Sequence, residues 1–191
     1  VGGLDLRQYK GIHYNSVRNL LGAEYVLEVY NATPTTSRGA GNANNPINMA
    51  KTGDKIGFYY DGLVGWQGAF VQGEYSYGNL SAFLSLSGSN TSYQRVDHFK
   101  YLDSDPARKS AKVNYFGYQT KGGANYNIDQ HHNVFANIGY FEKAPIFEAV
   151  FAGYQNKKNA DAVSEKILSY ELGYGYRSTK FSGNVNIYRT T

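Results

Sequence analysis

The fold class follows from one stretch of the chain, Leu80-Ser81-Ala82-Phe83-Leu84-Ser85-Leu86-Ser87. Apolar residues occupy every second position, and serine fills most of the positions between them. Because successive side chains of a strand point to opposite faces, this two-residue rhythm predicts a β-strand with one apolar face.

The same rhythm recurs along the chain and predicts about seven strands. These predicted strands cover residues 2–9, 68–77, 80–87, 113–128, 133–141, 168–177 and 181–189. We find no convincing amphipathic helical pattern, and at residues 16–28 we expect at most a short turn of helix. The composition agrees, because 22 Gly, 19 Tyr and 10 Phe in 191 residues favour strands over helices. The predicted fold class is all-β.

The connections between the predicted strands alternate in length. Tight turns are expected at residues 78–79, 129–132 and 178–180, and long connections at residues 10–63, 96–111 and 143–166. Short turns at one end and long loops at the other predict an antiparallel up-and-down meander with two unlike rims.

Tyrosines gather on the apolar face just before the three tight turns. This predicted ring consists of Tyr75, Tyr77, Tyr126, Tyr174 and Tyr176. Tyrosine is favoured where a surface passes from hydrocarbon to headgroup, so the ring favours a transmembrane β-barrel. A soluble antiparallel sandwich with the apolar face as its core gives a similar alternation and stays as an alternative.

The strand count bears on whether the chain closes by itself. Bacterial single-chain barrels use an even number of strands, from about 8 upward, so about seven predict a sector of a larger barrel. We expect residues 1–191 to form a single barrel segment, part of a roughly 22-stranded barrel. A small self-contained barrel acting as an anchor would need an eighth strand within residues 10–63.

Composition excludes several classes of function. The chain has no Cys, which removes thiolate metal sites and cysteine nucleophiles, and it has no apolar run of the length that a membrane-spanning helix needs. Its net charge of +4 comes from scattered Lys and Arg, so we expect no nucleic-acid partner. Without a nucleophile elbow, a Walker motif or a dinucleotide-binding motif, we expect no enzymatic activity and no cofactor.

Two groups of possible metal ligands are weak candidates. His131 and His132 share a tight turn without a third ligand nearby, and Asp103 and Asp105 lack the glycine and glutamate of an EF-hand loop. No metal site is therefore predicted.

Ligand contacts are expected in the long connections and high on the wall, where aromatic side chains stand near hydrogen-bonding groups. The candidates are His13, Tyr14, Tyr59, Tyr60, Trp66 and Tyr154. The polar face is expected to point into the barrel lumen, toward water. Its predicted members are Gln72, Glu74, Gln119, Lys121, Asn125, Asn137 and Glu171.

Three stretches resemble TonB-dependent outer-membrane receptors. Residues 133–145 (NVFANIGYFEKAP) and the following 146–151 (IFEAVF) resemble the strand that enters an Arg-Ala-Pro corner in this family. Residues 164–176 (SEKILSYELGYGY) resemble the next strand, which often carries Pro-Glu and then Tyr-Glu-Leu-Gly. Lys143 replaces the common Arg, and Ser164 the common Pro. Residues 57–92, including DGLVGW at 61–66, more loosely resemble receptors of the Bacteroidetes type.

The resemblance implies a location in the bacterial outer membrane and a role in nutrient uptake. Measured against this family, we expect residues 1–191 to contain no plug domain and no TonB box, and the polar lumen residues to face water or the plug of the complete receptor. The complete receptor would bind a scarce nutrient, such as a chelated metal, cobalamin or a glycan, and import it with energy transmitted through TonB. The implied partners are outer-membrane lipid, the plug domain and remaining strands of the same receptor, the TonB complex and the small-molecule or glycan ligand. A secreted or surface all-β module that binds a carbohydrate or another ligand is the alternative function.

Overall fold

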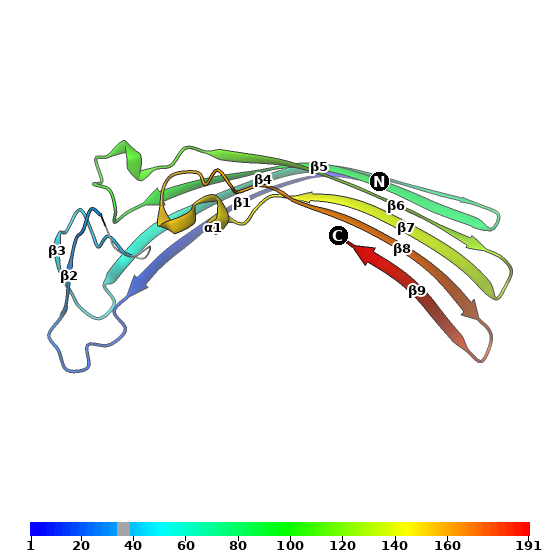
Figure 1. Ribbon diagram of the computed structural model, residues 1–191, viewed down its shortest axis with the longest axis horizontal. Coiled ribbons are helices and arrows are strands. Elements are labelled where there is room, and N and C mark those ends of the chain that lie inside the picture. Colours follow the sequence, from blue (N-terminus) through cyan, green and yellow to red (C-terminus); the bar gives the residue numbers. More distant parts are fainter. Residues whose placement is uncertain (34–38) are drawn as a thin grey trace.

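Strands make up most of the chain in the computed structural model, which describes residues 1–33 and 39–191 (Figure 1). Seven of them form one antiparallel sheet in an order that follows the chain, and β2 (Val26–Val29) pairs separately with β3 (Ile47–Ala50). The sheet consists of β1 (Gly2–Ser16), β4 (Lys55–Tyr77), β5 (Leu80–Asp97), β6 (Val113–Asn127), β7 (His132–Lys143), β8 (Glu165–Arg177) and β9 (Ser182–Thr190). The seven predicted strands and the meander are confirmed.

The sheet is a single curved layer (Figure 1). Two short helices, α1 (Phe147–Val150) and η2 (Ala152–Tyr154), lie against its concave side. A third, η1 (Pro106–Arg108), belongs to the connection after β5. On the convex side, the connection after β5 contacts the sheet near Tyr59 and Asp61, and no described segment covers the apolar positions closer to the turn end.

The two ends of the sheet differ as the connection lengths predict. At one end, called the turn end, tight turns join β4 to β5, β6 to β7 and β8 to β9. Gly78 supplies the left-handed backbone of the first turn, with φ of 56°. The opposite end, called the connection end, carries the long segments at residues 17–54, 98–112 and 144–164.

The predicted connection at residues 10–63 is too long, because β1 continues to Ser16 and β4 begins at Lys55. The added parts of these strands pair with each other, apart from an irregularity after Tyr14. Alternation fades there because both faces carry polar and aromatic side chains, such as Asp61 on the convex face, that contact loops. A strand without one consistently apolar face gives no two-residue signal.

No helical turn forms within residues 16–28, where the sequence predicts at most a short one. The first part of this stretch forms a hydrogen-bonded turn in which the Ala23 N–H donates to the Leu20 carbonyl at 2.9 Å. Leu21 and Gly22 both adopt positive φ, 51° and 92°, which a right-handed helix excludes. The last part of the stretch enters β2, which is stabilised by pairing with the distant β3.

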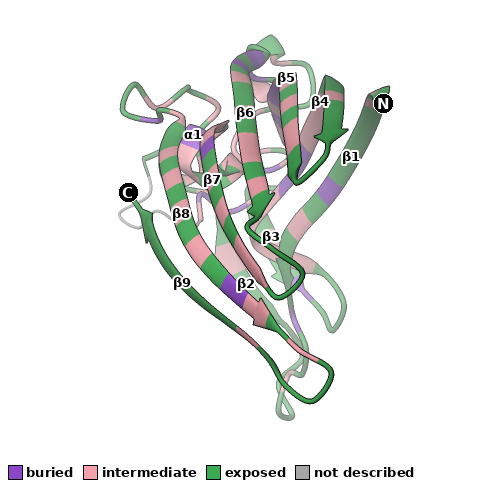
Figure 2. Cartoon of the chain, turned by 90° about the vertical axis from the view of Figure 1, so that its right-hand side faces the viewer, coloured by how far each residue is buried: buried purple, intermediate pink, exposed green. Residues whose placement is uncertain are grey.

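The convex face carries an apolar band without a cover. Leu84, Ile138 and Leu172 are 54%, 60% and 66% exposed. Burying one such side chain contributes about 1.5–3 kcal/mol, so a bare band of them is stable only in apolar surroundings. The sandwich alternative needs a second sheet over these residues. Among the described residues the second sheet is the pair of β2 and β3, which lies at the connection end and not over the band (Figure 1). Figure 2 shows the resulting alternation of exposed and partly buried positions along β6 and β8.

Aromatic residues border the apolar band on both sides. The predicted tyrosine ring lies on the convex face at the turn end, and a second group that was not predicted lies toward the connection end. This second group consists of Phe116, Tyr118 and Tyr140. Tyr118 and Tyr126 in β6 stand about 26 Å apart along the strand, or about 20 Å after a tilt of about 40°. That spacing is comparable to the apolar band of about 25 Å in membrane barrels.

The sheet is open along β1 and β9, which each pair with one neighbour among the described residues. The self-contained barrel alternative is therefore wrong for these residues. Strands do occur within residues 10–63, but β2 and β3 pair with each other and do not bridge β1 to β9.

A small core forms where α1 and η2 pack on the concave face. Its buried members are Tyr93, Val113, Tyr115, Val150, Phe151 and Ala162. The Phe147 ring of α1 lies 3.1 Å from where a Cβ on Gly62 would stand, so the helix packs directly on the backbone of β4. This packing holds the connection after β7 against the wall.

Candidate ligand site

Aromatic side chains gather on the concave face at the connection end. The register of β1 on β4 pairs His13 with Tyr60, and their rings stack with centroids 4.9 Å apart. Tyr154 of η2 meets Tyr60 edge-on at 6.1 Å, and the Phe147 ring lies parallel to Tyr60 at 6.3 Å. Three of the six predicted contact residues therefore come together.

The other three predicted contact residues lie elsewhere. Tyr14 follows His13 by one position and Tyr59 precedes Tyr60 by one, so both point to the convex face. There Lys55 Nζ lies 3.4 Å from the Tyr59 ring centroid. Trp66 lies on the concave face closer to the turn end, with the Arg7 guanidinium 5.3 Å from its ring centroid.

A buried ion pair underlies the concave aromatic group. Arg95 and Asp97 of β5 are 1% and 4% exposed, and Arg95 Nη1 donates to Asp97 Oδ2 at 2.7 Å. The same nitrogen donates to Asn156 Oδ1 at 2.8 Å, and the guanidinium lies 4.1 Å from the Tyr60 ring centroid. Sequence analysis missed this pair, although its spacing of two residues places both charges on one face of a strand.

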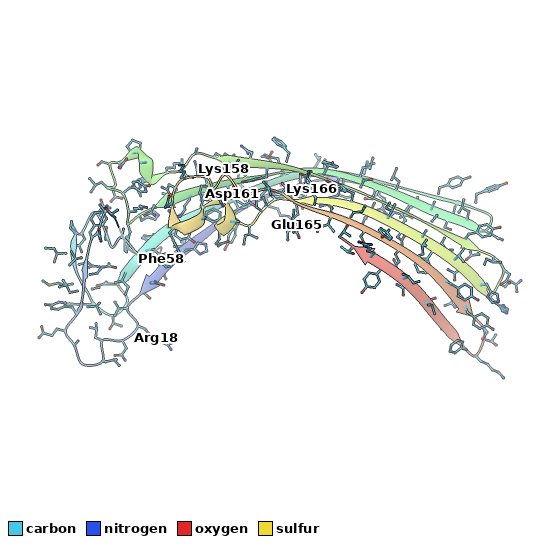
Figure 3. All side chains as sticks on the ribbon, viewed as in Figure 1. Arg18, Phe58, Lys158, Asp161, Glu165 and Lys166 are labelled. Carbon is cyan, nitrogen blue, oxygen red and sulfur yellow. The ribbon has the colours of Figure 1, made fainter. Side chains whose placement is uncertain are left out.

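Arg95 lines two neighbouring cavities. The larger has a volume of about 340 Å³, and Asp97, Phe99, Lys100 and Tyr154 also contribute to its lining. Phe58, labelled in Figure 3 at the connection end, adds an aromatic wall and contacts Tyr154 with centroids 4.9 Å apart. The smaller cavity has about 140 Å³ and is bordered by Glu148.

A polar network on the convex face ties the connection after β5 to the sheet. Lys10 Nζ donates to Asp61 Oδ2 at 2.9 Å, and His98 Nε2 donates to the same oxygen at 3.0 Å. Arg108 Nη2 donates to His98 Nδ1 at 3.0 Å, and Arg108 Nη1 pairs with Asp103 Oδ1 at 2.8 Å. Burial raises the pKa of Asp61, but the hydrogen bonds from Lys10 and His98 outweigh it and leave the pKa below its ordinary value.

All seven predicted lumen residues share the concave face. The register places Gln72 level with Lys121, and it places Glu74, Asn137 and Glu171 level with one another, with Gln119 and Asn125 in the flanking rows. Asn137 Nδ2 donates to Glu171 at 3.0 Å, and Gln72 Nε2 donates to Glu74 at 2.9 Å. That they face a plug stays a prediction.

The histidine turn has a structural use. The N–H groups of His131 and His132 donate to Asp129 Oδ1 at 2.7 and 2.8 Å. The hydrogen bond from His131, assisted by the one from His132, outweighs a small effect of burial and lowers the pKa of Asp129. Within residues 1–33 and 39–191, no three His, Cys, Asp or Glu side chains are grouped so that they could hold a metal ion.

The Asp103 and Asp105 loop is likewise occupied by local contacts. Asp105 Oδ1 accepts the Ala107 N–H at 2.8 Å and caps η1, whereas Asp103 pairs with Arg108. In the part of the chain that the structure describes, no helix is both long and apolar enough to cross a membrane.

Comparison with protein families agrees with two features of the sheet: the uncovered apolar band on the convex face, and the tight turns at one end with long connections at the other. The family described as TonB dependent receptor-like, beta-barrel, matches residues 2–191. The chain belongs to this family. TonB-dependent receptors are outer-membrane receptors and transporters, so the segment is part of a receptor barrel. No curated protein and no solved structure matches the chain.

Proposed function

We propose that residues 1–191 form a wall segment of a receptor that captures a scarce nutrient outside the cell and imports it with energy transmitted through TonB. Membership in the receptor family carries this proposal. The nutrient classes expected from the resemblance are a chelated metal, cobalamin and a glycan.

Each surface of the segment has a role in this proposal. The convex band faces outer-membrane lipid, and the concave polar face borders a plug domain. Backbone groups at the open edges of β1 and β9 would be unpaired in lipid, so we propose that further strands of the same receptor pair with them. His13, Tyr60 and Tyr154 at the connection end contribute to nutrient binding, and the proposed role is not enzymatic.

Uptake by cells tests the proposal. We expect deletion of the gene to abolish uptake of one labelled nutrient from a panel of iron chelates, cobalamin and glycans, and deletion of TonB to abolish it equally. Uptake of every member of the panel at wild-type levels in both strains would contradict the proposal.

Detergent dependence separates the receptor from a secreted binding module. The purified receptor is expected to stay folded and dispersed only with detergent or lipid. A protein that stays folded and monomeric after detergent removal would favour the secreted module.

A further inference from the structure

We infer that the convex face carries a binding site for one glycolipid of the outer membrane. An acyl chain of this lipid would lie in a groove across β4, β5 and β6, and its sugar head group would lie on a patch of amide side chains directly beyond the groove. The inference rests on the proposed function in one respect, because it needs the convex face to border membrane lipid. It adds a specific lipid partner to that face.

The first observation is a groove in the apolar band, close to the border of the band on the side of the connection end. The groove has a volume of about 450 Å³. Its convex side chains come from two neighbouring rows of the sheet, which are Ala69, Gly88 and Tyr118, and then Val71, Leu86 and Thr120. Small residues form the floor and larger ones the walls. Such a groove suits an acyl chain, because contact with floor and walls adds dispersion attraction that a flat surface lacks.

Gly88 keeps the floor of the groove open. A Cβ at this position would meet no described atom within 4 Å, and Gly88 is not among the glycines with positive φ. The fold therefore tolerates a side chain at position 88, but that side chain would occupy the groove. On the β6 side the wall is fixed, because the Tyr118 ring stacks on Tyr140 with centroids 5.4 Å apart.

The second observation is a patch of amide side chains beyond the groove, toward the connection end. Gln67 and Asn90 lie level with each other about 6.8 Å farther along the strands, and Asn114 follows one row later. Asn90 Nδ2 donates to Asn114 Oδ1 at 3.3 Å. Phe116 lies in the row of Asn90 and is 76% exposed, so its ring offers an apolar face beside the amides. Amides donate and accept hydrogen bonds, as sugar hydroxyls do.

The charges near the patch favour a sugar head group over a phosphate alone. From β1 to β6, the two rows that hold the amides contain no charged side chain. In the next row Lys10 is engaged with Asp61, with Nζ 2.9 Å from Oδ2. Phosphates are typically bound by Lys or Arg, whereas neutral amides suit hydroxyl groups. The groove lies toward the membrane centre and the amides toward its surface, which is the order of chain and head group in a glycolipid.

Lipid binding by the purified full-length receptor tests the inference. The receptor is delipidated in a detergent without a sugar head group and titrated with three probes, and bound probe is counted by native mass spectrometry. Monophosphoryl lipid A carries acyl chains on a phosphorylated glucosamine disaccharide. Dipalmitoyl phosphatidylethanolamine carries acyl chains and a phosphate without a sugar, and chitobiose is a glucosamine disaccharide without chains.

We expect one molecule of lipid A to bind saturably. Phosphatidylethanolamine should bind about tenfold more weakly, as the loss of one or two hydrogen bonds predicts, and chitobiose should not bind. Binding of phosphatidylethanolamine as tight as that of lipid A would overturn the glycolipid assignment.

Variants connect the binding to the groove and the patch. G88L fills the groove and should weaken lipid A binding about fivefold through lost chain contacts. G73L is the matched control, because Gly73 lies on the convex face outside the groove and a Cβ there also meets no described atom within 4 Å. Equal urea midpoints of G88L and G73L in vesicles would show that G88L is folded. Q67A/N114A should lower lipid A binding to the level of phosphatidylethanolamine and leave the latter unchanged.

Lipid A binding that G88L and Q67A/N114A both leave at the wild-type level would overturn the inference. The proposed function fails separately. Nutrient uptake by a receptor that binds no lipid A would contradict the glycolipid site alone. Saturable lipid A binding by a receptor whose deletion changes no nutrient uptake would contradict the proposed function alone.

Discussion

Gly117 of β6 lies beside the end of β7, where β7 is no longer paired with β6 but is still paired with β8. Replacement of Gly117 by Ala tests how closely the β7 backbone approaches β6 there. A Cβ on Gly117 would stand 2.6 Å from the carbonyl oxygen of Glu142, whereas ordinary contact begins at 3.4 Å. Pairing of β6 with β7 stops at Gln119 and Phe141, just before this point. Because the obstacle is backbone, β7 must move by about 0.8 Å to admit the methyl group.

Overpacking of this kind destabilises the folded state by about 1–3 kcal/mol. Ala also lowers the conformational entropy of the unfolded chain relative to Gly, which offsets about 0.4–1 kcal/mol of this loss. We therefore expect G117A to lower the free energy of unfolding by about 1–2 kcal/mol. The matched control is G88A on the neighbouring β5, where a Cβ meets nothing within 4 Å. It should be neutral or slightly stabilising.

The assay is reversible urea unfolding of the full-length receptor in phospholipid vesicles, followed by tryptophan fluorescence. G117A should unfold at lower urea concentration than G88A, with a similar dependence on urea concentration. Equal urea midpoints for the two variants would refute the claim that the β7 backbone lies too close to Gly117 to admit a side chain.

Three further predictions concern lipid, acid and the convex network. I138K places a charge on the apolar band and should reduce membrane insertion by about 2–4 kcal/mol in a vesicle-folding assay, whereas N137K on the concave face should fold nearly as wild type. Since the pKa of Asp129 is lowered in the folded state, its stabilising effect is full above about pH 4 and is lost as pH falls through the lowered pKa. The difference between wild type and D129N in unfolding midpoint should therefore shrink below about pH 4, and a difference constant with pH would contradict this. D61N should speed hydrogen exchange in residues 98–109, measured by mass spectrometry, because it removes the charge that Lys10 and His98 contact; unchanged exchange would show that the network does not hold this connection.

The membrane-facing half of the sheet could be predicted from sequence because one physical constraint acts on it. Lipid on one face and a polar lumen on the other force alternation, as at Leu84 and Ser85, and the strands, turns and tyrosine ring follow. Beyond the band, loops and water contact both faces. The parts of β1 and β4 nearest the connection end therefore carry no alternation, and the sequence predicts a connection there.

The candidate site could be predicted only in part, since it depends on contacts between distant segments. His13 and Tyr60 meet through the register of β1 on β4, and Tyr154 reaches them because α1 and η2 fold back over the wall. No local pattern encodes these contacts. Arg95 and Asp97 read in the sequence as two charges of a strand. They are buried because α1 and η2 pack over the concave face.

The central claim is that the convex side chains face lipid and the concave ones face an aqueous lumen. Nitroxide labels on L84C and S85C, neighbours on opposite faces, test it most directly, since these 191 residues contain no Cys. In vesicles we predict that collisions with dissolved oxygen dominate for the label at position 84 and collisions with a water-soluble nickel chelate dominate at position 85. Shielding of the position 84 label from both reagents would place Leu84 in a protein interior and contradict the account.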